Sequence, residues 1–182
     1  SIAKNIVAND QMFKKGLWDP YKHKAVTLHN KKVLFLGYGA IAQEIKKLCK
    51  PFNVKFMAVK KTTTKVKDVE IFLSTQKRQA LKKADFIVNT LPLTDETRDF
   101  LNTADFEIMK DTAYVVNVGR GATINEKALY EALKEKRIAG AGIDVWYNYP
   151  KSRASGKQEP VPCYPSEYPF HELDNIIMTA HR

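Results

Sequence analysis

The fold of this chain is decided by Tyr114-Val-Val-Asn-Val-Gly-Arg-Gly121 and, one helix-length later, by Ala139-Gly-Ala-Gly-Ile-Asp-Val145. Each segment is an apolar run, the first ending in Gly-Arg-Gly and the second in Asp144, with a helical pattern between them. This arrangement predicts two neighbouring parallel strands that bring Arg120 and Asp144 to the same sheet edge, where open parallel sheets bind their ligands. An arginine there suits a small organic acid, because its planar guanidinium matches a carboxylate in bidentate fashion.

Strand and helix patterns alternate along the whole chain. We expect strands at 31–37, 54–59, 85–90, 113–118, 138–145 and 175–179, and helices at 40–49, 75–83, 103–110 and 125–136, the last with Asn125 as its N-cap. This alternation predicts the α/β class with a Rossmann-type, doubly wound parallel sheet. We assign 1–30 to a connecting helix and lead-in and 31–182 to a dinucleotide-binding domain, with a long proline-rich loop at 147–170.

Composition sets further limits. With 182 residues, 44% hydrophobic and 27% charged, the chain has the profile of a globular protein with one core. No apolar run reaches the roughly 20 residues that span a bilayer, and no signal-peptide pattern opens the chain. Cys49 and Cys163 are isolated thiols without metal-ligand spacing, as is usual in a reducing compartment. We therefore expect a cytoplasmic protein with neither a metal site nor a membrane partner.

The net charge of +10 is concentrated in one region. Residues 45–67 contain eight lysines and no acidic residue. No aromatic platform, helix-turn-helix or zinc spacing accompanies them, so we expect no nucleic-acid partner. Two interpretations stay open, namely a solvated face that keeps the protein in solution and a site for a phosphorylated ligand.

A glycine-rich turn, Gly37-Tyr38-Gly39-Ala40-Ile41-Ala42, lies between the first expected strand and its helix. The first glycine permits a tight turn, and the second lets backbone N–H groups approach a pyrophosphate at the helix N-terminus. Within a strand–helix–strand unit, the pattern predicts dinucleotide binding.

The end of the second expected strand indicates which dinucleotide is preferred. An acid at this point would accept a hydrogen bond from the adenosine ribose of NAD, but the chain has Lys60-Lys61-Thr62. Two lysines and a threonine favour a 2′-phosphate instead, so we expect NADP to be preferred over NAD. The alternative is that both lysines belong to a solvated basic face.

Four blocks of the sequence match one known family. They are GYGAIAQEI from Gly37, ADFIVNTLPLTDETRDFLN from Ala84, MKDTAYVVNVGRGATINEKALYEALKEKRIAGAGIDVW from Met109 and LDNIIMTAH from Leu173. On these blocks the chain resembles the nucleotide-binding domain of the D-isomer-specific 2-hydroxyacid dehydrogenases. That family includes glyoxylate/hydroxypyruvate reductases, D-glycerate and D-lactate dehydrogenases, phosphoglycerate dehydrogenase and, more distantly, formate dehydrogenase.

The resemblance implies roles for individual residues. Arg120 would bind the carboxylate and carbonyl of a small 2-keto acid, His181 would be the acid/base, and Asp144 would hold the nicotinamide carboxamide. Further cofactor contacts are implied for Leu91, Pro92, Thr97 and Val118. The resemblance also implies a homodimer and a second, substrate-binding domain. On that basis we interpret the chain as an excised cofactor domain or as part of a longer protein.

The chain departs from the family pattern after Asp144. The family usually has a glutamate before the proline, where it orients the catalytic histidine, but this chain reads Asp144-Val-Trp-Tyr-Asn-Tyr149-Pro150. Either Tyr149 occupies the glutamate position, the alignment that we favour, or Glu159-Pro160 restores the pair within the long loop.

Two classes of function therefore remain. One is an NADP-dependent reductase of glyoxylate, hydroxypyruvate or a similar acid. The other is a non-catalytic NAD(P)(H)-sensing protein like the corepressors that resemble this family. A formate-dehydrogenase-like enzyme is a variant of the first class.

Overall fold

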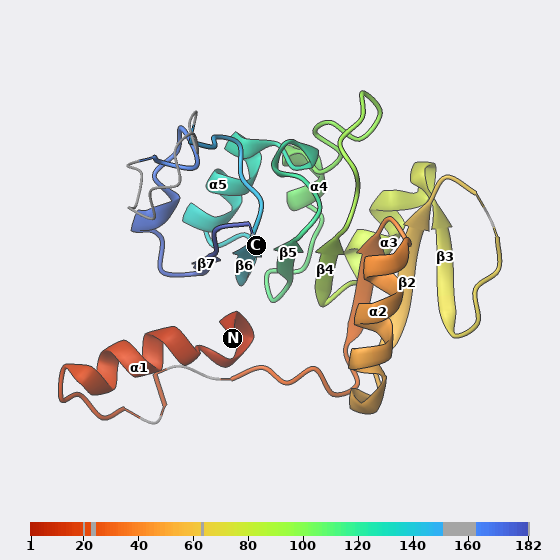
Figure 1. Ribbon diagram of the computed structural model, residues 1–182. Helices are drawn as coiled ribbons and strands as arrows, with labels where there is room; N and C mark the ends of the chain where they lie inside the picture. Colours follow the sequence, from red (N-terminus) through yellow and green to blue (C-terminus); the bar gives the residue numbers. More distant parts are fainter. Residues whose placement is uncertain (20, 23–24, 63, 151–162, 182) are drawn as a thin grey trace, which may run out of the picture.

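The computed structural model describes residues 1–19, 21–22, 25–62, 64–150 and 163–181. Its described part is built around a seven-stranded, wholly parallel sheet in the order β3-β2-β1-β4-β5-β6-β7 (Figure 1). The strands are β1 Lys32–Leu36, β2 Lys55–Lys60, β3 Val69–Leu73, β4 Phe86–Asn89, β5 Tyr114–Asn117, β6 Gly140–Ile143 and β7 Ile176–Met178. The doubly wound parallel sheet expected from the sequence is confirmed.

Helices cover both faces of this sheet (Figure 1). The α-helices are α1 Ile6–Lys14, α2 Ala40–Cys49, α3 Lys77–Lys83, α4 Thr103–Phe106 and α5 Glu126–Lys134, and the short 3₁₀ helices are η1 Ile2–Lys4, η2 Lys50–Phe52, η3 Ser74–Gln76, η4 Gly121–Thr123 and η5 Phe170–Glu172. One core cluster lies between the sheet and α3, α4 and α5. A smaller cluster lies on the opposite face, under α2.

Side chains of β1, an interior strand of the sheet, alternate between these two clusters. Leu34 and Leu36 of β1 enter the larger core, while Val33 and Phe35 enter the smaller one. A strand buried on both faces needs an unbroken apolar run, and Val33-Leu-Phe-Leu36 is one. The helix that follows β5 begins as expected, because the side chain of Asn125 accepts a hydrogen bond from the N–H of Ala128 at 3.0 Å.

The sequence analysis missed β3, which pairs with β2 from Phe56↔Val69 to Lys60↔Leu73. Only Phe72 of this strand is buried, and Glu70 is exposed. β3 lies at the edge of the sheet, so its side chains do not form the apolar run that marks the other strands. Three expected helices are also shorter than their patterns suggested: α4 ends at Phe106, α5 ends at Lys134, and the helix expected from residue 75 begins as the 3₁₀ turn η3.

The two ends of the N-terminal segment are hydrogen-bonded to each other and pack against the sheet. The N–H of Val26 donates to the carbonyl of Ala3 at 2.7 Å, and Ile2, Val26 and Leu28 pack against the smaller core. Beyond this contact α1 extends away from the sheet (Figure 1) and buries only Met12. In the described part of the chain no helix combines the length and apolarity needed to cross a membrane.

Candidate functional site

The residues singled out from the sequence follow strands of one parallel sheet, so they meet at its carboxyl edge. In sheet order they are Lys60 to Thr62 after β2, Gly37 to Ile41 after β1, Leu91 and Pro92 after β4, Val118 and Arg120 after β5, Asp144 after β6 and His181 after β7. This edge is where ligands of open α/β sheets bind.

The glycine turn after β1 has the geometry that a phosphate cradle needs. Gly37 has φ +80°, and an added Cβ would lie 3.1 Å from Cδ2 of Leu91. Gly39 is the N-cap of α2, and an added Cβ there would meet nothing within 4 Å. No side chain caps α2, so no capping side chain accepts from its first N–H groups at the positive end of the helix dipole. The residues present therefore fit the pyrophosphate of a dinucleotide.

Behind this turn lies a cavity of about 670 Å³. Eight of the residues predicted to bind cofactor line it: Gly37, Tyr38, Gly39, Lys60, Lys61, Thr62, Leu91 and Thr97. Ser74, Glu96 and Phe100 line it as well, and the sequence analysis did not find them. They come from the β3–α3 turn and from the loop after β4, neither of which carries a cofactor motif of its own.

The cations at the end of β2 have different surroundings. The exposed Lys61 forms an ion pair with Glu96 across the cavity, whereas the half-buried Lys60 has no ion pair within the described residues. A carboxylate is thus present in this cavity, but it comes from the loop after β4 and is engaged by Lys61. Of these two lysines, Lys60 is the one available to bind an anionic ligand, because Lys61 is paired with Glu96.

Hydrogen bonds to backbone carbonyls hold the predicted residues after β4 and β5. The buried hydroxyl of Thr97 donates to the carbonyl of Pro92 at 2.6 Å and thereby holds the loop after β4. The N–H of Val118 donates to the carbonyl of Asn89 at 3.1 Å. These bonds hold the loop after β4 and the start of the loop after β5 at the carboxyl edge of the sheet.

A buried polar network, which the sequence analysis also missed, binds the backbone carbonyl of Arg120. Nδ2 of Asn89 donates to Oδ1 of Asn117 at 2.9 Å and to the hydroxyl of Thr123 at 2.6 Å. Asn117 Nδ2 and the Thr123 hydroxyl both donate to the carbonyl of Arg120, at 3.1 and 2.6 Å. Asn89 and Asn117 each end a buried strand and are register partners, a signal that two apolar runs ending in Asn could have given.

The two glycines around Arg120 are fixed by close packing. A Cβ on Gly119 would lie 2.6 Å from the carbonyl oxygen of Leu91, and a Cβ on Gly121 would lie 2.2 Å from that of Trp146. Neither gap admits a methyl group. The backbone of the Gly-Arg-Gly turn is therefore held between the loops after β4 and β6, while the side chain of Arg120 is exposed.

At the ends of β6 and β7 a second set of contacts forms. The hydroxyl of Thr179 donates to Oδ1 of Asp144 at 2.6 Å, and Nε1 of Trp146 donates to the carbonyl of Thr179 at 2.8 Å. His181, two residues further on, is exposed and has φ +42°. A positive φ is uncommon for a non-glycine residue, and such strain is enriched at functional sites.

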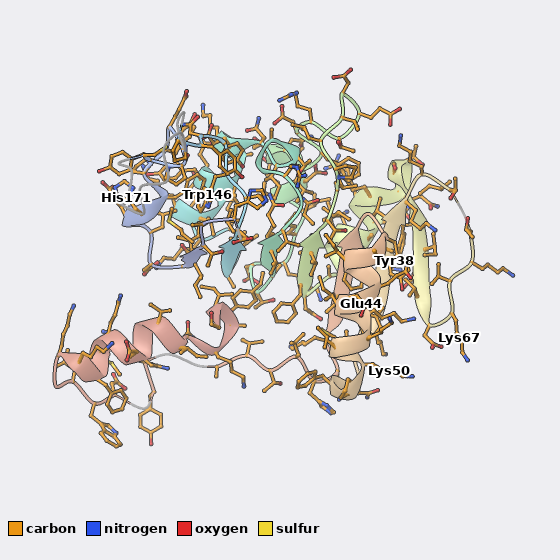
Figure 2. All side chains as sticks on the ribbon, viewed as in Figure 1. Tyr38, Glu44, Lys50, Lys67, Trp146 and His171 are labelled. Carbon is orange, nitrogen blue, oxygen red and sulfur yellow. The ribbon has the colours of Figure 1, made fainter. Side chains whose placement is uncertain are left out.

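His181 lines a different cavity from the predicted cofactor residues. This cavity, of about 820 Å³, also includes Trp146 and Tyr149. Figure 2 labels Tyr38, from the first cavity, and Trp146, from the second, on opposite sides of the central strands. Arg120 and Asp144 follow β5 and β6, which lie between β1 and β7 in the sheet. The predicted residues therefore lie along one edge, but Gly37 and Lys60 line one cavity and His181 lines another.

Tyr149 is the aromatic neighbour of His181. The two ring centroids are 5.7 Å apart, and the hydroxyl of Tyr149 accepts a hydrogen bond from the N–H of Trp146 at 3.0 Å. Glu159, the other candidate partner of His181, lies outside the described residues. Within the described ranges no carboxylate forms a hydrogen bond or ion pair with His181, and no group of three His, Cys, Asp or Glu side chains could hold a metal.

Comparison with known proteins gives consistent similarities. The family profile described as "D-isomer specific 2-hydroxyacid dehydrogenase, NAD binding domain" matches residues 1–182. D-3-phosphoglycerate dehydrogenase of Methanocaldococcus jannaschii is 34% identical over 184 residues, which cover 100% of this chain and 32% of that protein. Glyoxylate reductase of Pyrococcus furiosus is 32% identical over 189 residues, covering 100% and 52%.

Among solved structures, acyclic imino acid reductase (Bsp5) in complex with NADPH and D-Arg matches with a TM-score of 0.82 and 27% identity. The match covers 98% of this chain and 52% of that one. The chain therefore spans between about a third and about a half of the length of these proteins.

Proposed function

The chain belongs to the D-isomer-specific 2-hydroxyacid dehydrogenase family, and we propose that it is the NADP(H)-binding part of a longer reductase of small 2-keto acids. The observation that carries the proposal is the row of groups along one sheet edge: the cradle of Gly37 and Gly39, the cation Lys60 and the exposed Arg120. Glyoxylate reductase, 32% identical over the whole chain, supports a 2-keto acid such as glyoxylate or hydroxypyruvate as substrate.

NADP is the proposed cofactor because the positive charge at the end of β2 exceeds the negative. Lys60 and Lys61 face one carboxylate, Glu96, across the cavity. A 2′-phosphate would bind Lys60 and compete with Glu96 for Lys61. The Gly37–Ile41 turn and the N-terminus of α2 would bind the pyrophosphate, Tyr38, Leu91, Pro92 and Thr97 would line the nucleotide, and Val118 and Asp144 would approach the nicotinamide.

NADPH, when bound, supplies the hydride for the keto carbon. Arg120 would hold the substrate carboxylate and stabilise negative charge that develops on the keto oxygen. His181 would donate a proton to that oxygen. The network of Asn89, Asn117 and Thr123 fixes the backbone that carries Arg120, so these buried residues would position the arginine without touching the substrate.

The second candidate is a non-catalytic, cofactor-sensing binding protein. It is favoured by the contact of Tyr149 with His181 if, as in the alignment that we favour, Tyr149 takes the place of the family's usual glutamate. A tyrosine cannot provide the carboxylate that would stabilise an imidazolium. A formate-dehydrogenase-like enzyme is a further variant, because that branch also lacks the glutamate. The retained Arg120 and His181 favour the reductase.

A panel of 2-keto acids with NADPH and NADH, run on the full-length protein, tests the proposal. We expect NADPH-dependent reduction of glyoxylate or hydroxypyruvate, and its loss in Arg120→Gln. Tight NADPH binding without turnover of any acid would instead support the sensing protein, and NAD-dependent oxidation of formate would support the third variant. Sedimentation of the same sample tests the homodimer that the family relationship suggests.

A further inference from the structure

The amino-terminal edge of the sheet carries a second basic cavity, of about 450 Å³, that the proposed function does not use. Four lysines line it: Lys32 at the start of β1, Lys55 at the start of β2, and Lys46 and Lys50 from the last part of α2 and the turn after it. Figure 2 labels Lys50 at the base of α2, at the end opposite Tyr38. Lys55, which lines this cavity, and Lys60 lie at opposite ends of β2. At roughly 3.3 Å per residue they are about 16 Å apart.

Two of these lysines are placed where their charges repel. Lys32 and Lys55 are register partners on adjacent parallel strands, and like charges directly opposite each other destabilise a sheet. The nearby carboxylate of Asp85 does not relieve them, because it accepts from the side chain of Lys110 at 2.7 Å and from the backbone N–H of Lys32 at 2.8 Å. Neither Lys32 nor Lys55 has a side-chain ion pair within the described residues.

The α2 lysines have a partial explanation of their own. Lys46 and Lys50 lie near the helix C-terminus, where cations complement the helix dipole, and Nζ of Lys46 donates to the carbonyl of Lys67. The dipole does not explain Lys32 and Lys55, which begin strands. It also does not explain why both pairs line the same cavity.

Acidic residues only partly compensate this charge. Asp68 and Glu70 also line the cavity, so the formal balance is four lysines minus two carboxylates, or +2. Glu70 is engaged by Lys83 outside the four, at 2.9 Å. The cavity therefore has an excess of cations and room for several phosphate groups, since small-ligand sites typically measure about 300–1,000 Å³.

We propose that this cavity binds the phosphate chain of a small polyphosphate anion, at a site separate from the dinucleotide. The phosphates would replace the repulsion between Lys32 and Lys55 by charge-assisted hydrogen bonds, with Lys46 and Lys50 closing from the helix side. The chain could belong to inorganic polyphosphate or to a nucleoside triphosphate, which share this chemistry.

Calorimetric titration with tripolyphosphate tests the site, with NADPH present in saturating amount because the cofactor cavity also accepts phosphates. We expect one bound tripolyphosphate per chain. Lys50→Gln and Lys55→Gln should each weaken it by about ten-fold, the value of one charge-assisted hydrogen bond. Lys127→Gln, an exposed lysine of α5 paired with Glu131, is the matched control and should change nothing.

Thermal unfolding gives a second readout that does not depend on heats of binding. Without anion, Lys55→Gln should unfold no lower than wild type, because it removes a repulsion. With tripolyphosphate the Tm should rise in wild type and in Lys127→Gln but not in Lys55→Gln. ATP that binds more tightly than tripolyphosphate would identify a nucleotide as the source, and equal affinity would identify the phosphate chain alone.

Three results would overturn the proposal. NADPH could displace tripolyphosphate, which would locate the anion in the cofactor cavity. Lys127→Gln could weaken binding as much as Lys55→Gln, which would indicate unspecific charge attraction. A single-stranded oligonucleotide could bind more tightly than tripolyphosphate, which would indicate a nucleic-acid surface instead of a small-anion site.

Discussion

At the scale of single residues, the proposed preference for NADP rests on the two lysines at the end of β2. Lys60 is half-buried and has no ion pair within the described residues, while Lys61 is held by Glu96. The two lysines therefore differ in their availability to an anion even though they are adjacent in the sequence. A change at Lys60 should alter cofactor choice more than the same change at Lys61.

Lys60→Asp should remove the preference for NADPH. The loss of one charge-assisted hydrogen bond to the 2′-phosphate corresponds to about 1.5–3 kcal/mol, or roughly ten-fold or more in Kd. Fluorescence titration of wild type and variant with NADPH and NADH measures it. Glu96→Gln is the matched control, and it should tighten NADPH because it releases Lys61. Equal affinity of the wild type for both cofactors would contradict the prediction.

A second single residue of interest is Tyr149, the aromatic neighbour of His181. Tyr149 packs against the imidazole, and its hydroxyl is already used as acceptor by the N–H of Trp146. A carboxylate at this position would stabilise the charged imidazolium. Keto-acid reduction needs that protonated form, so the identity of residue 149 should set the upper pH limit of reduction.

Tyr149→Glu should extend reduction by the full-length enzyme to higher pH, and the wild type should lose activity at lower pH than glutamate-bearing relatives. The pH profile of kcat/KM measures this shift. Glu159→Gln serves as the control and should leave the profile unchanged. If Glu159→Gln moves the profile or abolishes turnover, Glu159 is the partner of His181 and the preferred alignment is wrong.

At the scale of elements, Asp85 ties three strands together at the amino-terminal edge of the sheet. Its carboxylate accepts from Lys32 and Lys110, its N–H donates to the carbonyl of Lys32, and its carbonyl accepts from Tyr114. Burial favours the neutral acid, but the hydrogen bonds from Lys110 and Lys32 and the charges of Lys110 and Lys31 outweigh it, so the pKa of Asp85 is lowered. β1, β4 and β5 thus share one charged anchor.

Asp85→Asn should lower the free energy of unfolding by about 1–2 kcal/mol at neutral pH, as expected for weakened hydrogen bonds to a charged group. Because the folded-state pKa is lowered, this stability is present above the unfolded value of about 3.9 and is lost as the pH falls through the folded value. Urea unfolding from pH 7 to pH 3 should therefore show wild type and variant converging. The exposed Asp111→Asn is the control, and a constant difference down to pH 3 would argue against a charge effect.

At the scale of the whole molecule, the site is a row of groups along an open edge. Arg120 and His181 are both exposed, and the cofactor and histidine cavities are separate hollows. Hydride transfer requires a closed cleft from which water is excluded. The relatives are two to three times as long as the matched region.

Residues 1–182 expressed alone should bind NADPH yet reduce no 2-keto acid. The cradle at Gly37 and Gly39 and the cation Lys60 lie within these residues, so binding needs nothing further. Quenching of protein fluorescence by NADPH and an NADPH-consumption assay on the same sample measure the two properties. Measurable reduction of glyoxylate or hydroxypyruvate by this fragment would show that a second domain is dispensable.

The sequence by itself determined the parallel sheet, the glycine turn between β1 and α2 and the placement of Lys60, Arg120, Asp144 and His181 at one edge. These features depend on local patterns: apolar runs give strands, helical spacing gives crossovers, and residues that follow parallel strands share an edge by topology. Glycines in a turn report backbone constraints that are local as well.

Only the tertiary structure decided which distant groups meet. Glu96 reaches Lys61 from another loop, and Ser74 and Phe100 join it in lining the cofactor cavity. The network of Asn89, Asn117 and Thr123 and the convergence of Lys32 with Lys55 depend on strand order and register. The physical reason is that contacts between distant residues form only after the chain has closed long loops. A pattern within a short window can mark the single residues, but it does not encode which of them pair.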